Sequence, residues 1–274
     1  MKKLSLLVCS FLIVTLVMGQ GRVSLPFSSA YDEDAVLLLG IQYNYVNQNY
    51  QLKLKENWQD YRIDYGDNNI NHLGELKSIR SVNSHGVSVG IPIDLRVNAN
   101  LYFNFSPSFL FINNSGIEYT SVDDQYEPII RRTRHSIGNS KGTNFNTFEF
   151  PLSIKFRSDE KYLKNKFNRY RAYVLGGIRY SRWVGIDKEY RGWISQQNET
   201  IPHPIIVKSS YPSWDIGLGA DIFFPYFKVS PEIRFNQSFG SILDTQHVLA
   251  QDNKFMAPLR KAYLRNIYVS LIFQ

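Results

Sequence analysis

The sequence predicts an all-β protein: an eight-stranded antiparallel transmembrane β-barrel, preceded by a cleaved signal peptide. Three observations lead to this fold class. Apolar and polar residues alternate in eight segments, which is typical of strands with one apolar and one polar face. The connections between these segments alternate between short and long. After the first twenty residues, no apolar run is long enough for a transmembrane helix, although the chain is rich in aromatic residues.

The N-terminus has the features of a secretory signal. Two lysines precede an almost unbroken apolar stretch over 4–18, and small residues suitable for cleavage end at Gly19. We therefore expect 1–19 to be a signal peptide and 20–274 to be a single barrel domain. The only cysteine, Cys9, falls in this peptide, so the mature chain is expected to lack disulfides, thiol nucleophiles and cysteine metal ligands.

The first half of the chain supplies four expected strands. Residues 36–47 alternate leucine, isoleucine and tyrosine with glycine, glutamine and asparagine. Residues 86–97 alternate valine, isoleucine and leucine with small or polar residues, and 99–111 and 145–157 alternate phenylalanine and leucine with polar ones. This period of two fits strands and no helix.

The second half supplies the other four strands. Residues 169–181 alternate more weakly than 212–224 and 226–238, which are separated only by a short turn at Pro225. The last strand is expected over 263–273 and stops one residue before the C-terminus. An even number of strands places the first and the last residue of the barrel on the same side of the membrane.

The lengths of the connections favour an outer-membrane location. Short turns near Asn98 and Pro225 and a basic segment over 158–168 join strands at one rim, and the other rim carries the long connections 48–85, 112–144, 182–211 and 239–262. Loops of this length are uncommon in compact soluble β domains. Long loops on one rim and short periplasmic turns on the other are typical of bacterial outer-membrane barrels.

A soluble lipocalin-like barrel or sandwich is the competing fold. In that fold the apolar strand faces would form the core, and they carry many large rings, namely Phe103, Phe105, Phe109, Phe148, Phe150 and Phe156. The interior of an eight-stranded barrel is only just filled by ordinary side chains. These rings would overfill it, whereas they fit without strain against lipid, so the membrane barrel is favoured.

With the apolar faces turned to lipid, charged residues of both signs point into the lumen. They are Asp94, Arg96, Glu149, Lys155, Asp215, Asp221, Lys228, Glu232 and Arg234. Buried charges are tolerated when they are paired and hydrogen-bonded, so we expect a luminal charge network that leaves little room for diffusion. This argues against a general porin. An ion or proton pathway through the network remains the alternative.

A basic segment on the expected periplasmic side has two interpretations. It contains Arg157, Lys161, Lys164, Lys166, Arg169 and Arg171, against Asp159 and Glu160. It is either a solvated turn or a docking surface for a partner. A second basic run, 131–135, is expected in a solvated loop near lipopolysaccharide. Nucleic-acid binding is not expected there, because acidic residues precede the run and it lacks the interleaved stacking aromatics that such binding requires. Outer-membrane lipid and lipopolysaccharide are thus the expected surroundings, without nucleic acid.

No catalytic, cofactor or metal site is predicted. The five histidines, His72, His85, His135, His203 and His247, lie in expected loops or at a strand edge, without metal-ligand spacing. The alternative is a barrel enzyme acting on lipid or lipopolysaccharide, in which Ser84-His85 and Asp123-Asp124 would meet at the loop rim. Such a triad is defined by geometry that spacing does not supply. We therefore expect a protein that is not an enzyme.

Several blocks resemble the PorT/SprT-type proteins of the Bacteroidetes. FEFPLSIKFRS at 148–158 is similar to the signature FEFPL-x-x-K-F/Y-x-S of that family, and RAYVLGG at 171–177, DIGLGAD at 215–221 and PYFKVSPEIRF at 225–235 follow in the family's order. The resemblance runs from about residue 36 to the end and weakens in the long loops, with 186–211 atypical.

This resemblance implies an outer-membrane barrel that type IX protein secretion and the associated gliding motility require. The other components of that secretion system would be its partners. The family has no known catalytic residues, so none is transferred to this chain. A structural or adhesion barrel without a role in secretion is the remaining alternative, since a fold alone does not specify a function.

Overall fold

The computed structural model describes residues 23–24, 35–64, 72–136, 139–162, 169–195 and 203–274. The expected signal peptide, 1–19, lies outside these residues. Strands dominate the described part of the chain, and none of its helices is long and apolar enough to cross a membrane.

The barrel has eight strand positions, each of which we call a wall. Three of these walls are built from two consecutive strands. The first wall is β2 (Leu37–Leu39) with β3 (Ile41–Leu54), the second is β6 (Ser84–Gly90) with β7 (Ile93–Arg96), and the third is β8 (Leu101–Phe105) with β9 (Ser108–Phe111). The other five are β14 (Thr147–Arg157), β16 (Arg169–Trp183), β17 (Ser210–Phe223), β18 (Lys228–Ser238) and β19 (Leu259–Phe273). Two short strands at the rim, β1 (Val23–Ser24) and β15 (Lys161–Tyr162), extend the sheet.

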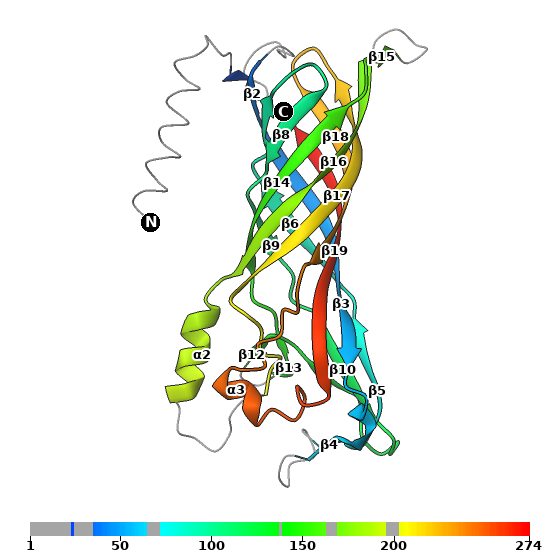
Figure 1. The fold of residues 1–274 in the computed structure, drawn as a ribbon, viewed down its shortest axis with the longest axis vertical. Helices are drawn as coiled ribbons and strands as arrows, with labels where there is room; N and C mark the ends of the chain where they lie inside the picture. The colour runs from blue at the N-terminus through cyan, green and yellow to red at the C-terminus, as the bar shows by residue number, and fades with distance from the viewer. Residues whose placement is uncertain (1–22, 25–34, 65–71, 137–138, 163–168, 196–202) are drawn as a thin grey trace.

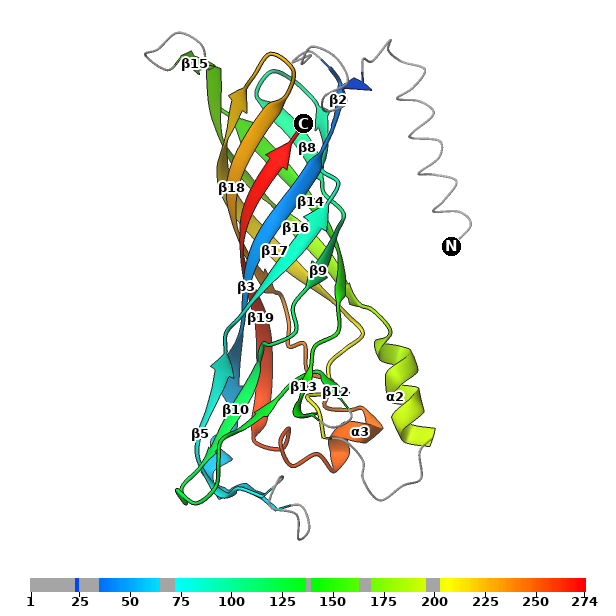
Figure 2. The same ribbon diagram turned by 180° about the vertical axis from the view of Figure 1, so that it is seen from behind.

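Each wall pairs antiparallel with its neighbour in sequence, and the last pairs with the first. β19 and β3 are in register from Leu259 opposite Leu54 to Phe273 opposite Ile41. We call this pairing the seam. It joins the two ends of the sheet into a ring, which confirms the predicted eight-stranded antiparallel barrel (Figures 1 and 2).

Proline and glycine explain why the first three walls are interrupted. Proline has no N–H to donate to a strand ladder, and β6 ends just before Pro92 while β9 begins just after Pro107. Between β2 and β3, a Cβ on Gly40 would lie 2.2 Å from the carbonyl oxygen of Phe273, so the close approach of the two chains there requires glycine.

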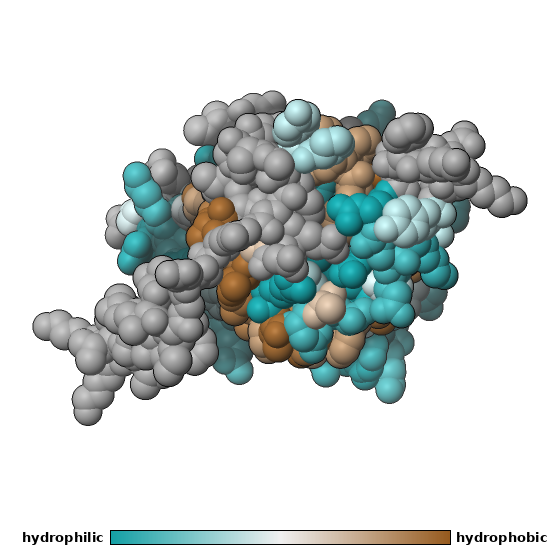
Figure 3. All heavy atoms as spheres, turned by 90° about the horizontal axis from the view of Figure 1, so that it is seen from above, coloured by the Kyte–Doolittle hydropathy of each residue, from teal (hydrophilic) through white to brown (hydrophobic). Residues whose placement is uncertain are grey.

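The two ends of the barrel differ in structure. The short β7–β8 and β17–β18 turns and the C-terminus lie at the end drawn uppermost in Figure 1, which we call the turn end. At the opposite end the long connections fold into a separate body, the head. Seen from the turn end, hydrophilic residues occupy much of the visible described surface and hydrophobic residues appear at its margins (Figure 3).

The head is more ordered than the loops that the sequence led us to expect. It contains a four-stranded sheet of β4 (Arg62–Ile63), β5 (Gly74–Val82), β10 (Gly116–Ser121) and β11 (Ile129–Arg131), and a hairpin of β12 (Arg134–Ser136) and β13 (Asn139–Thr143). A 3-10 helix, η1 (Trp58–Asp60), and two α-helices, α2 (Ile186–Ser195) and α3 (Val248–Gln251), complete it. The outer ends of β3 and β19 run from the barrel into the head (Figure 1).

The head has its own hydrophobic core, to which all four long connections contribute. Leu73, Tyr119, Ile206 and Phe255, one from each connection, are completely or almost completely buried in it. Tyr119 also donates a hydrogen bond from its hydroxyl to the carbonyl oxygen of Phe255, 2.6 Å away. These contacts hold segments far apart in sequence in one packed unit.

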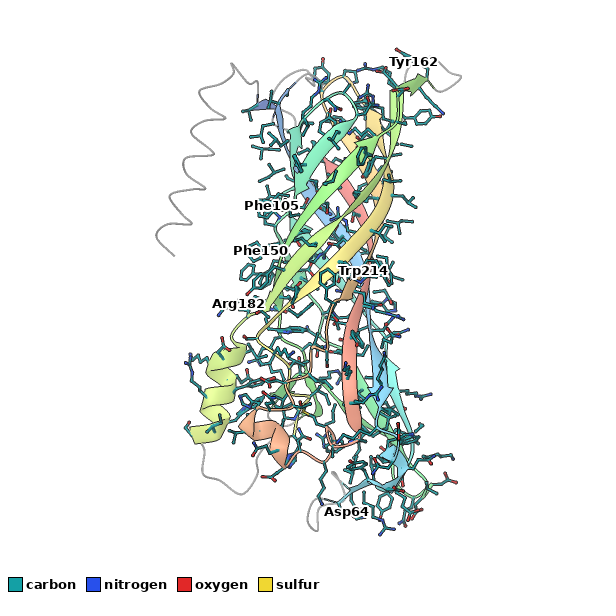
Figure 4. The ribbon with its side chains drawn as sticks, viewed as in Figure 1. Asp64, Phe105, Phe150, Tyr162, Arg182 and Trp214 are labelled. Carbon is teal, nitrogen blue, oxygen red and sulfur yellow. The ribbon has the colours of Figure 1, made fainter. Side chains whose placement is uncertain are left out.

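The outer surface of the barrel is apolar, as predicted. Burial along β14 alternates strictly, with Phe148, Phe150, Leu152, Ile154 and Phe156 facing outward and 41–55% exposed. Figure 4 shows Phe105 and Phe150 on the exterior of the barrel. Apolar residues of the other walls continue this band, and they include Tyr43, Val89, Phe103, Ile178, Leu218, Ile233 and Val269. A continuous exposed apolar band around a ring of strands is the lipid-facing surface of a transmembrane barrel.

Candidate functional site in the barrel lumen

The same alternation that exposes the phenylalanines of β14 turns its polar residues inward. Glu149, Ser153, Lys155 and Arg157 are all at most 4% exposed. Charged side chains from β7, β16, β17 and β18 join them, whereas β3, β6 and β19 line the opposite side mainly with uncharged residues such as Asn44, which donates a hydrogen bond to Ser88. The lumen is thus filled by side chains, and most of its charge comes from one side.

Three cations and two carboxylates form a compact group near the turn end. We call it the turn-side cluster: Asp94, Lys155, Arg157, Asp221 and Lys228. Nε of Arg157 lies 2.7 Å from Oδ2 of Asp221, and Nζ of Lys155 lies 3.4 Å from Asp221 and 3.5 Å from Asp94. Nζ of Lys228 lies 3.8 Å from Asp94 and 3.7 Å from Asp221. Every cation of the cluster therefore faces both carboxylates.

Neutral groups complete the surroundings of these charges. Asn104 donates a hydrogen bond to Asp94 over 2.6 Å, and Ser230 donates one to Asp221. Nζ of Lys155 lies 3.8 Å from the centre of the Tyr173 ring. Cations over aromatic faces are stabilised by the ring quadrupole, most strongly where water is excluded. The turn-side cluster is therefore held by rings and hydrogen bonds in addition to its ion pairs.

A second group of charges lies closer to the head. We call it the head-side cluster: Glu149, Arg179, Asp215, Glu232 and Arg234. Arg179 bridges Glu149 at 2.9 Å and Asp215 at 3.0 Å, and Arg234 lies 2.7 Å from Glu232. The hydroxyl of Tyr268 donates to Glu149 over 2.7 Å. Tyr173 connects the two clusters, because its hydroxyl donates to Glu232 over 3.0 Å while its ring contacts Lys155.

The two clusters together are electrically balanced. The turn-side cluster has three basic and two acidic side chains, and the head-side cluster has two basic and three acidic ones, so their formal charges of +1 and −1 cancel. All ten side chains are buried. Mutual pairing with additional hydrogen bonds is the condition under which buried charges are tolerated.

The structure brings together eight of the nine residues expected in the lumen. The exception is Arg96, which is half-buried at the end of β7 near the rim. Arg179 was absent from the expected set although it lies at the centre of the head-side cluster. Its position on the polar side of the alternating segment 169–181 was the signal that could have identified it.

One residue of the expected basic docking turn belongs to the lumen instead. Arg157 was expected to be part of a periplasmic surface, but it is 4% exposed and pairs with Asp221. The physical reason is that β14 continues through residue 157, so that the alternation places this side chain on the inward face.

The other expected turn residues lie at the rim where they are described. Lys161 is exposed in β15, Arg169 lies 3.3 Å from Glu160, and Arg171 donates to the carbonyl oxygen of Ala99 over 3.0 Å. Lys164 and Lys166 lie outside the described residues. Among the described residues of this set, Arg169 and Arg171 are half-buried by contacts within the rim, whereas Lys161 is exposed.

The residues considered for catalysis do not form a triad in the described structure. Ser84 is buried on the luminal side of β6, while His85 faces outward and stacks on Tyr45. Asp123 accepts hydrogen bonds from Gln125 in the connection after β10.

The other histidines are dispersed. His72 lies 3.1 Å from Asp64, His203 is half-buried, and His247 caps α3, while the side chain of His135 is outside what the structure describes. Among the described residues there is no group of His, Cys, Asp or Glu that could hold a metal ion.

The chain resembles known proteins only distantly, and only among solved structures. The sequence matches no family model and no curated protein. Among solved structures, Neisserial surface protein A is 8% identical, with 85% of this chain and 95% of that one covered and a TM-score of 0.36. Ail of Yersinia pestis (9% identity, 86% and 96% covered, TM-score 0.29) and the outer membrane protein OprG of Pseudomonas aeruginosa (7%, 85% and 93%, 0.31) are similarly distant.

The class of the protein follows from its own geometry. A closed antiparallel ring with an apolar exterior and a buried charged lumen is the architecture of outer-membrane β-barrels. This chain is an outer-membrane β-barrel of eight strands. Its lumen is packed and its long connections form a folded head on one side of the membrane.

Proposed function

We propose that this protein is a non-conducting outer-membrane barrel that serves as an accessory component of type IX protein secretion and the associated gliding motility. The observation that carries the first half of this proposal is the filled lumen, in which ten charged side chains are paired and buried. A barrel closed in this way has no path for bulky solutes. Its working surfaces are then the head and the turn end.

The link to secretion rests on the resemblance to the PorT/SprT-type proteins. The block at 148–158 coincides with β14, which contributes Glu149, Lys155 and Arg157 to the lumen. The block at 225–235 covers the start of β18 and contains Lys228 and Glu232. The similar blocks are therefore those that form the sealed barrel. This supports an anchor or assembly role in the membrane more than a role as the export channel.

We expect the purified protein to form no discrete channels in a planar lipid bilayer. The reason is that an ion crossing the lumen would have to separate buried ion pairs, which is costly because the charges are desolvated. Single-channel recording at both polarities, with a porin of known conductance as the positive control, measures this. Reproducible unitary steps that persist after repurification would refute the non-conducting barrel.

Deletion of the gene is expected to leave cargo proteins with C-terminal sorting domains inside the cell and to abolish surface spreading. Immunoblots of culture medium and cell fractions against such a cargo measure export. Complementation with the wild-type gene is the control for polar effects. Unchanged secretion and motility would exclude the export role while leaving the sealed barrel intact, and they would favour a structural or adhesion barrel.

A further inference from the structure

A surface groove lies where the barrel wall meets the head. It has a volume of about 440 Å³ and is lined by Phe111, Asn113, Arg134, Phe145, Asn146 and Val184, among others. Phe111 ends β9 and is 43% exposed as part of the lipid-facing band. Asn146 and Val184 are the first residues beyond β14 and β16 on the head side, and the N–H of Val184 donates to the carbonyl oxygen of Asn146. We call this feature the rim groove.

The three arginines of the basic run have different environments, and only one of them faces the rim groove. The guanidinium of Arg131 lies 4.1 Å from the centre of the Phe255 ring, inside the head. Arg132 is buried and donates to the carbonyl oxygen of Gly142 over 3.2 Å. Arg134 is 51% exposed and lines the groove. The charge that this run offers to a ligand is therefore concentrated on Arg134.

The orientation of Arg134 leaves part of its guanidinium available. Its Nε donates to Oε2 of Glu189 over 2.8 Å, and Glu189 itself is not among the residues that line the groove. Within the described part of the chain, its guanidinium also lies over the ring of Phe145, 5.8 Å from the ring centre, and its two terminal nitrogens make no hydrogen bond. An arginine oriented by a carboxylate on one edge presents its other donors in a fixed fork, the geometry suited to a phosphate group.

An aromatic ladder leads from the groove along the lipid-facing wall. The ring centres of Phe109 and Phe111 are 4.6 Å apart, and those of Phe109 and Phe148 are also 4.6 Å apart. An acyl chain lying on these rings would begin at the groove, where Asn113 and Asn146 offer amides that hydrogen-bond to hydroxyl groups. The groove thus brings together a cation, amide groups and an apolar path, which suit the phosphate, sugar and chains of a membrane lipid.

We infer that the rim groove binds the phosphorylated headgroup of an outer-leaflet glycolipid, with one acyl chain on the Phe109–Phe111–Phe148 ladder. Arg134 holds the phosphate, and Asn113 and Asn146 contact the sugar. Charge complementarity favours an anionic ligand, and continuity with the lipid-facing band favours a membrane lipid over a soluble anion. The inference is independent of the proposed role in secretion, because it depends only on the membrane position of the barrel.

The test uses the full-length mature protein in lipid nanodiscs made of phosphatidylcholine with a small fraction of diphosphorylated lipid A. Native mass spectrometry of the released protein counts the lipid A molecules that remain bound. We expect the wild-type protein to retain one molecule and Arg134→Gln to lower retention about tenfold, because a hydrogen bond to a charged group is lost. Asn113→Trp, which fills the groove and keeps Arg134, is expected to lower it as well.

Arg182→Gln is the matched control. Arg182 is 59% exposed and lies 3.4 Å from the carboxylate of Asp187, so it resembles Arg134 in exposure and pairing, but it is not among the residues of the groove. It lies at the head end of β16 (Figure 4). Retention equal to that of the wild type is expected for this variant. Equal losses in Arg182→Gln and Arg134→Gln would overturn the inference, as would full retention in Arg134→Gln.

Two further arms identify the part of the ligand that is recognised. Dephosphorylated lipid A is expected to be lost from the wild-type protein, and its full retention would contradict a phosphate contact. Inorganic phosphate at millimolar concentration is expected not to displace lipid A. Displacement by phosphate alone would show a simple anion site and would refute the glycolipid assignment.

Discussion

Asp221→Asn is expected to destabilise the folded barrel by about 3–5 kcal/mol. Asp221 faces Lys155, Arg157 and Lys228, and its removal leaves these three buried cations with Asp94 as the only carboxylate of the turn-side cluster. The asparagine has nearly the same shape, so the loss reflects charge and not a cavity. An unpaired buried charge is among the largest single-residue effects on protein stability.

Urea unfolding in lipid vesicles, followed by the heat-modifiable shift on gels, measures this loss. The matched control is Glu75→Gln in the head. Glu75 also pairs with an arginine, Arg62, at 2.6 Å, but both side chains are about 60% exposed, 63% for Arg62 and 59% for Glu75. Exposed pairs contribute little to stability, because water and salt screen them. Equal effects of the two substitutions would mean that the lumen is hydrated like the surface.

Leu218→Arg is expected to destabilise the membrane-inserted protein by about 2–4 kcal/mol. Leu218 is 61% exposed near the middle of β17 and belongs to the lipid-facing band. Arginine there would place a charge in the hydrocarbon region, whereas in a soluble protein the same substitution at an exposed site would have almost no effect. The result therefore reports directly on what surrounds this wall.

Val122→Arg provides the comparison. Val122 is 54% exposed, but it lies in the head just beyond β10, outside the barrel wall. Its substitution is expected to change stability by less than about 0.5 kcal/mol. Equilibrium unfolding from vesicles of defined chain length measures both variants. A small effect at Leu218, equal to that at Val122, would be incompatible with a lipid-facing wall.

Most of the barrel was predictable because local alternation specifies it. Each strand has one face in lipid and one in the lumen, so every second residue carries the signal, and the expected segment 145–157 differs from β14 by two residues at its start. The seam was implied by an even number of strands. Interruptions at Gly40, Pro92 and Pro107 did not obscure the pattern, because alternation resumes beyond each of them.

The sequence predicted that the lumen is charged, but it predicted less well which residues form the two clusters. Alternation places charges inside, but it does not say which of them meet. Arg157 was assigned to the turn although the expected segment 145–157 already ended at it, and its place in step with Glu149 and Lys155 on the polar face was the signal that it points inward. Arg179 comes from a strand in which Gly176 and Gly177 weaken the alternation, so its inward position was less evident.

The head was not foreseen because its contacts are long-range. Its strands β4, β11 and β12 have only two or three residues each, too few for a period to emerge. Ile205, Ile206 and Val207 form an apolar run outside any regular strand, and their burial depends on residues such as Met256 from another connection. No local pattern encodes a core assembled from four distant segments.

The seam has a consequence for the order in which the protein assembles. Its register joins the first wall to the last, so β3 has no partner on that side until the C-terminal strand has been delivered. Tyr50 and Leu264 face each other across the seam and are both buried in the core of the head. The contacts that close the ring thus also complete that core, so neither can be finished before the C-terminal strand is in place.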